Sequence, residues 1–131
     1  GDGELNEGSN WEAFIFLKEY NFLKNLVIII DFNKFMTLKD TKKILNSKII
    51  ENFFKDKKID FFQVDGHNLN AIDKIFSKIR NSNKLTIVFL DTIKGKGIKF
   101  MENNKKWHHR VPNQEEYFEG KRQLNKIIND L

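Results

Sequence analysis

The sequence has no cysteine and a single proline among its 131 residues. Without cysteine there can be no disulfide framework, no thiolate zinc site and no cysteine nucleophile, which excludes several secreted and redox classes. The longest uninterrupted apolar run spans residues 26–30, far short of the roughly 20 residues that a membrane helix needs. We therefore expect no transmembrane segment and no membrane partner, and a cytoplasmic location is compatible with this composition.

Low-complexity segments and internal repeats are also missing. The composition is 40% hydrophobic and 31% charged, with 13 phenylalanines, which is typical of a globular chain that fills one domain or part of one. The chain begins at Gly1, with neither an initiator methionine nor a signal peptide. We expect it to be a piece of a longer protein.

The net charge of +5 is concentrated in one segment. Residues 94–110 contain six lysines and arginines and one acid, Glu102, whereas the rest of the chain is balanced. A nucleic-acid-binding protein would spread its basic excess over a whole face or helix, so we expect no nucleic-acid partner. The pattern favours a local anion site, and the alternative is a solvated lysine-rich loop.

Helical and strand-like periodicities alternate along the chain. This alternation predicts an α/β fold, with a parallel sheet, flanking helices and right-handed crossovers. The expected helices cover residues 11–22, 47–55, 68–81 and 114–131, and the expected strands cover 26–32, 61–64 and 85–90.

The apolar patterns also predict burial. Helix 11–22, with Ser9 as N-cap and Glu12 closing a capping box, is apolar on nearly every face and should be buried all round. Strand 26–32 should be buried on both faces. The residues of the last helix that should face inward are Tyr117, Leu124, Ile127, Ile128 and Leu131.

Ligands of parallel α/β sheets bind beyond the carboxyl ends of the strands. Residues 1–3, Gly-Asp-Gly, resemble the end of a further strand, and Asn33 follows strand 26–32. Asp2 and Asn33 could together offer a carboxylate and an amide oxygen, the ligand types that Mg²⁺ prefers. Taken alone, Gly-Asp-Gly is more often only a turn.

Several motifs occur in an order that resembles the thiamine-diphosphate family, and specifically the transketolase family. These motifs are residues 1–13 (GDGELNEGSNWEA), Asn33, residues 64–67 (VDGH), residues 94–98 (KGKGI) and Trp107-His108. The resemblance covers essentially the whole chain. It implies a thiamine-diphosphate-binding fold in which residues 1–131 form the later part of the diphosphate-binding domain.

The resemblance also implies a cofactor site for thiamine diphosphate and Mg²⁺, with Ca²⁺ or Mn²⁺ able to substitute. The metal ligands would be Asp2, Asn33 and the carbonyl of Phe35, and the N–H of Gly3 would contact phosphate. The residues expected near the cofactor are Lys94, His108 and Arg110, with His108 as a catalytic donor. His109 stands where relatives often carry glycine, which leaves the role of Arg110 open.

Two further acids match catalytic positions. Glu7 and Glu12 correspond to acidic residues that, in similar enzymes, form a proton-linked carboxylate network at the dimer interface. The alternative is that Glu12 only caps a helix and Glu7 is solvated. For His67, which follows Asp-Gly at a helix start, we favour a local turn or capping role.

The activity implied is transfer of a two-carbon ketol unit from a ketose phosphate to an aldose phosphate. The glutamate that activates the cofactor lies in a second domain outside these residues, so we expect no turnover by this chain alone. Its partner would be a second copy of the full enzyme or a separate C-terminal transketolase subunit. The alternatives are 1-deoxyxylulose-5-phosphate synthase, a 2-oxoacid dehydrogenase component, or a non-catalytic remnant of the fold.

Overall fold

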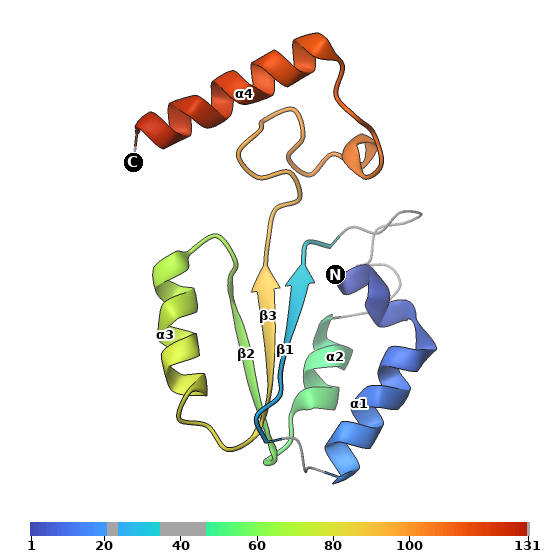
Figure 1. Ribbon diagram of the computed structural model, residues 1–131. Helices are drawn as coiled ribbons and strands as arrows, with labels where there is room; N and C mark the ends of the chain where they lie inside the picture. Colours follow the sequence, from blue (N-terminus) through green and yellow to red (C-terminus); the bar gives the residue numbers. More distant parts are fainter. Residues whose placement is uncertain (21–23, 35–46, 131) are drawn as a thin grey trace. The chain divides into compact units, whose positions relative to one another are not determined.

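The computed structural model describes residues 1–20, 24–34 and 47–130. Contacts divide the chain into two compact units, Gly1–Thr92 and Ile93–Leu131. The first unit holds a parallel sheet with flanking helices, and the second holds a loop and one long helix (Figure 1). The predicted α/β class is confirmed.

The sheet of the first unit has three strands in the order β1-β3-β2, all parallel. Helices α1 and α2 lie against one face of the sheet, and α3 lies against the other (Figure 1). The elements are η1 (Asp2–Asn6), α1 (Gly8–Tyr20), β1 (Val27–Phe32), α2 (Ser47–Phe54), β2 (Ile59–Asp65), α3 (Leu69–Ile79) and β3 (Leu85–Asp91).

The core between the sheet and helices α1 and α2 is rich in aromatic rings. Phe54 is 1% exposed and packs edge-on against Phe14, with ring centroids 5.1 Å apart. Residues 85–89 are all buried because β3 is the central strand and is covered on both faces. This packing holds the strand ends that carry the candidate site.

Two burial predictions for this unit are wrong within the described residues. In α1 only Phe14 is buried, whereas Phe16 is 48% and Tyr20 is 65% exposed. In β1 the side chain of Ile29 is 50% exposed. The physical reason is that α1 covers the sheet with one face only, and that β1 is an edge strand of the described sheet.

The N-terminus also differs from the prediction. Asp2 lies in the short 3₁₀ helix η1 and not at the end of a strand. Helix α1 begins at Gly8, so Ser9 is inside the helix and is not its N-cap. The predicted last residues of this helix, 21 and 22, lie outside the described residues.

The second unit consists of a glycine-containing loop, η3 (Lys105–Trp107) and α4 (Gln114–Asn129). Gly95 has a φ of +76°, and a Cβ there would lie 2.7 Å from the Met101 carbonyl oxygen, so only glycine fits this turn.

The inward face predicted for α4 is wrong within the described residues. Exposed fractions range from 41% for Leu124 to 66% for Ile128, because the loop of this unit covers only part of the helix, around the buried Gly120. Tyr117 and Ile127 are also exposed, and Leu131 lies outside the described residues. No helix in the described part of the chain is both long and apolar enough to cross a membrane.

Candidate functional site

Asp2 lies beside the residue that follows Asn33. The Asp2 side chain is 3% exposed, and its Oδ2 accepts a hydrogen bond of 2.7 Å from the backbone N–H of Lys34. Lys34, two residues after the end of β1, adopts a left-handed conformation with a φ of +67°. Two residues 32 positions apart in the sequence therefore meet at the carboxyl end of β1.

Hydrogen bonds from the start of α1 hold the short helix that carries Asp2. The Trp11 indole N–H donates to the Leu5 carbonyl at 2.6 Å, and the Asn10 amide donates to the Glu4 carbonyl at 2.7 Å. The Leu5 side chain is buried in the core. These contacts hold η1 against α1 and the core of the unit, and so they help to position the Asp2 carboxylate.

A network of polar side chains joins the strand ends. The Asn33 amide nitrogen donates to Asp31 Oδ2 at 3.1 Å, and the Thr92 hydroxyl donates to Asp31 Oδ1. Gln63 donates to Asp91 Oδ2 at 2.7 Å, and the Lys34 ammonium lies 3.3 Å from Asp91 Oδ1.

Sequence reasoning assigned no role to the other members of this network. The sequence did contain one signal for a role of these residues, because Asp31 and Thr92 each follow the apolar part of a strand. The sequence does not show that β1 and β3 are neighbours, and so it does not show that these two side chains meet.

The residues present fit a hard divalent cation. Such an ion in a diphosphate site takes one or two protein oxygens, with phosphate and water completing its shell. The buried Asp2 carboxylate and the Asn33 side chain provide oxygens of this kind. Within residues 1–20, 24–34 and 47–130 no group of three or more His, Cys, Asp or Glu could hold a metal alone, and Phe35 lies outside these ranges.

His108 lies in the second unit, directly after η3. Its ring packs edge-on against His109, with centroids 4.5 Å apart. Partial burial, followed by the positive charges of Lys94 and His109, lowers the pKa of His108 below its ordinary value of 6.5. At neutral pH the ring is therefore uncharged and offers one N–H donor and one nitrogen acceptor.

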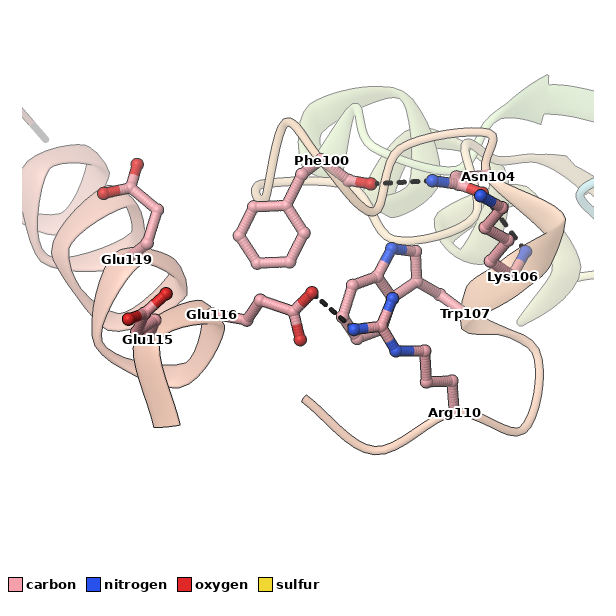
Figure 2. A pocket seen from close by; sticks show the side chains of 8 residues that line it. All are labelled: Phe100, Asn104, Lys106, Trp107, Arg110, Glu115, Glu116 and Glu119. Atoms are coloured by element: carbon pink, nitrogen blue, oxygen red, sulfur yellow. Dashed lines mark hydrogen bonds and ion pairs between the residues drawn. The ribbon is translucent and has the colours of Figure 1, made fainter. Parts of the chain in front are cut away.

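Arg110 makes contacts within its own unit. Its guanidinium carbon lies 4.5 Å from the centre of the Trp107 ring, and its Nη2 is paired with Glu116 on α4. These side chains line a pocket of about 450 Å³ (Figure 2). The remaining residues around the pocket are Phe100, Asn104, Lys106, Glu115 and Glu119.

Three other residues singled out in the sequence occupy distinct surroundings. Glu7 and Glu12 are exposed, at the end of η1 and on α1 respectively. The backbone N–H of His67 donates to Asp65 Oδ1 at 2.9 Å, which agrees with a local turn before α3. The capping role at α3 belongs to Asn68, whose side chain accepts from the N–H of Ala71.

Residues 1–125 match the family model described as transketolase, thiamine diphosphate binding domain. The chain belongs to this family. The expected resemblance and fold are thereby confirmed. A solved structure, the transketolase of Campylobacter jejuni, superposes with a TM-score of 0.85 at 25% identity, and the match covers 95% of this chain and 20% of that one.

The relatives of known name include bacterial and mammalian proteins. In Actinobacillus succinogenes and Phocaeicola vulgatus they are each named as one lettered subunit of an apulose-4-phosphate transketolase, and they are 36% and 34% identical to this chain over 88% and 100% of it. Human transketolase is 34% identical over 82% of the chain. The matched parts are 42% and 47% of the two bacterial relatives and 17% of the human protein. This member of the family therefore spans less than half the length of each relative.

Proposed function

We propose that this chain provides the diphosphate- and metal-binding site of a transketolase whose cofactor-activating domain is on a separate polypeptide. Two relatives that are named as one subunit of a transketolase support a split enzyme, because such a name implies a second subunit. The reaction proposed is two-carbon ketol transfer between sugar phosphates. A phosphorylated ketose would be the donor and a phosphorylated aldose the acceptor.

The proposed cation ligands are Asp2, Asn33 and the carbonyl of Phe35, and Gly3 is proposed to donate its N–H to phosphate. Support comes from the hydrogen bond between Asp2 and the Lys34 N–H, which brings positions 2 and 33 together. Thiamine diphosphate, when bound, supplies the electron sink for breaking a carbon–carbon bond beside a carbonyl. The cation offsets the repulsion between the diphosphate and the Asp2 carboxylate.

His108 is proposed to donate a hydrogen bond to the substrate oxygen that gains negative charge. A neutral imidazole can donate this bond at neutral pH without carrying a charge of its own. The lowered pKa of His108 supports this state. Lys94 and Arg110 are proposed to add positive potential near the phosphates. The Arg110 ion pair with Glu116 favours Lys94 as the stronger contributor.

Glu7 and Glu12 are proposed to lie where a second copy or the partner subunit packs. Both are exposed, and they flank or occupy α1, whose Phe16 and Tyr20 side chains are exposed apolar groups. Acidic and apolar groups that share one face are compatible with an interface that contains a carboxylate network. In this proposal, the catalytic role predicted for Glu7 and Glu12 is their part in the carboxylate network of that interface.

The proposed function is tested first at Asp2. In the complex of this chain with its partner subunit, Asp2→Ala should weaken binding of thiamine diphosphate and Mg²⁺ by at least about tenfold, because a buried metal ligand is lost. Isothermal titration calorimetry measures this affinity. Asp73→Ala, which removes an exposed acid on α3, is the matched control and should bind normally. Unchanged affinity in Asp2→Ala would refute the site.

A second experiment tests His108. If its hydrogen bond is stronger in the transition state than in the ground state, His108→Ala should lower kcat by more than it raises KM. Removal of one such donor in other enzymes costs about 3 kcal/mol. An effect on KM alone would assign His108 to substrate binding, and normal kinetics would remove it from the site.

A further inference from the structure

An asparagine side chain can ligate a metal only through its oxygen. The two ends of the amide are almost equal in size, so packing alone does not decide which end faces a cation. A neighbouring group that can only accept hydrogen bonds, or can only donate them, decides which end of the amide faces it. At position 33 that neighbour is Asp31, two residues earlier in the chain.

When it is ionised, the Asp31 carboxylate has no proton to donate and acts only as a hydrogen-bond acceptor. Its Oδ2 lies 3.1 Å from the Asn33 amide nitrogen. The reversed amide would set a carbonyl oxygen against a carboxylate oxygen, and two acceptors at this distance repel each other. The chemistry of Asp31 therefore selects the orientation in which the Asn33 nitrogen faces Asp31.

Asp31 is itself held from the neighbouring strand. The Thr92 hydroxyl, just beyond the end of β3, donates to Asp31 Oδ1. Both carboxylate oxygens of Asp31 are thus engaged, one by Thr92 and one by Asn33. A carboxylate bonded at both oxygens has little freedom to rotate away from the Asn33 amide.

Gly66 makes room for the Thr92 side chain. A Cβ on Gly66 would lie 2.5 Å from the Thr92 methyl carbon, closer than real atoms approach. The Gly66 N–H also donates to the carbonyl of Asp91 at 2.8 Å, which holds the two segments together. One line of contacts therefore runs from the turn after β2, through Thr92, to Asp31 and Asn33.

We propose that Asp31, supported by Thr92, is a positioning residue that turns the amide oxygen of Asn33 toward the cation. Asp31 is not itself a ligand in this scheme. The inference rests on the proposed function, in which Asn33 ligates the metal. It adds two residues, Asp31 and Thr92, for which the motif Gly-Asp-Gly with Asn33 gives no role.

The probe is Mn²⁺ with thiamine diphosphate, bound to the complex of this chain with its partner subunit. Free Mn²⁺ is counted by electron paramagnetic resonance, so the readout is metal affinity and not turnover. Asp31→Ala should weaken Mn²⁺ binding by about 10- to 100-fold, the range found when an outer-shell partner of a metal ligand is removed. Thr92→Val should weaken it less, and Thr92→Ser should bind as the wild type does.

Asp31→Asn serves as the conservative variant. Its own amide oxygen can still accept from Asn33, so it should retain most of the affinity that Asp31→Ala loses. Thermal unfolding followed by circular dichroism should show that all these variants fold. Asp31 is exposed, which makes a folding defect an unexpected result.

The deciding experiment repeats Asp31→Ala in an Asn33→Asp background. A carboxylate has two equivalent oxygens and needs no orienting neighbour, so here the loss of Asp31 should leave Mn²⁺ affinity unchanged or raise it. An equal loss in both backgrounds would show a general structural role and overturn the proposal. So would normal affinity of Asp31→Ala with Asn33 in place, or failure of folded Asn33→Asp to bind Mn²⁺.

The Asp2→Ala variant separates this inference from the function on which it rests. Weak binding in Asp2→Ala together with normal binding in Asp31→Ala would leave the cation site standing and overturn only the positioning role. Normal binding in Asp2→Ala would refute the cation site and the positioning role together.

Discussion

The guanidinium of Arg110 stacks on the Trp107 ring while it is ion-paired with Glu116. Trp107 and Arg110, on either side of the His108-His109 pair, therefore contact each other, and Arg110 also contacts α4. Glu116 also accepts from the N–H of Asn113 and so closes the capping box at the start of α4. The conformation of the histidine segment depends on this helix end.

Removal of the Arg110 side chain should loosen Trp107. In a Trp11→Phe background Trp107 is the only tryptophan, and Arg110→Met should make its fluorescence more accessible to acrylamide. Cation–π and ion-pair contacts at exposed positions are each worth about 0.5–1 kcal/mol, so the fold should remain intact. Arg122→Met, which removes the exposed pair with Glu119, is the control and should leave quenching unchanged.

The titration of His108 should respond to Lys94. Because the Lys94 charge helps to lower the pKa of His108, Lys94→Met should raise that pKa toward 6.5. Nuclear magnetic resonance of the imidazole C–H groups measures it, with His108→Gln identifying the signal. Lys99→Met should leave the pKa unchanged. A His108 pKa that does not move in Lys94→Met would contradict the charge contact.

The same lowered pKa has a consequence for stability. The unfolded chain binds a proton at His108 more readily than the folded chain does, so the unfolding free energy falls as the pH drops below about 6.5 and on through the folded pKa. Above that pH both states carry a neutral ring, and the contribution is complete. Replacement of His108 by Gln should flatten this part of the stability profile, measured by urea unfolding between pH 5 and 8.

Core and surface apolar residues should differ sharply in their effect on stability. Ile50 on α2 is 1% exposed, and Ile50→Ala should lower the unfolding free energy by about 2–5 kcal/mol through the cavity it leaves. Leu69 on α3 is 79% exposed, and Leu69→Ala should change that free energy by no more than about 0.5 kcal/mol. Similar losses in urea unfolding of both variants would contradict the assignment of the core.

The exposed apolar side chains of α1 should cause association when the 131 residues are produced without a partner. The rings of Phe16 and Tyr20 contact each other in a tilted arrangement, with centroids 4.6 Å apart, and both are substantially exposed. Sedimentation velocity should show oligomers, because contiguous apolar patches are rare on stable monomers. Replacement of both residues by serine should reduce association, whereas Leu69→Ser should not. A folded monomer of the unchanged chain would refute this prediction.

The sequence predicted the type of every described regular element except η1 and η3, because helical apolar segments alternate along the chain with short, continuous apolar runs typical of buried strands. Boundaries agreed within a few residues, as for β3, which extends to Asp91 where the prediction ended at Leu90. Burial was predicted less well. Helix α1 and strand β1 are apolar on surfaces that the described chain leaves exposed, and periodicity does not show what covers them.

For the candidate site, motif spacing predicted that Asp2 and Asn33 converge. The structure bonds Asp2 to the N–H of Lys34, the residue after Asn33, and the shared role of Asp2 and Asn33 stays a prediction. The contact between Asp31 and Thr92 could not be predicted in the same way. Those residues are 61 positions apart, and their meeting depends on β3 being inserted between β1 and β2. Alternation of helices and strands gives the class of sheet but not the order of its strands.

The order of the strands in the sheet determines when they can pair while the chain is being synthesised. Both β1 and β2 pair with β3, which is the last of the three to leave the ribosome. Until residues 85–91 emerge, the two earlier strands have no partner within the described sheet, and their backbone groups remain available to other chains. A nascent chain stalled before this point would carry the aggregation risk, so chaperone contacts on the ribosome should be concentrated there and should end once β3 is inserted.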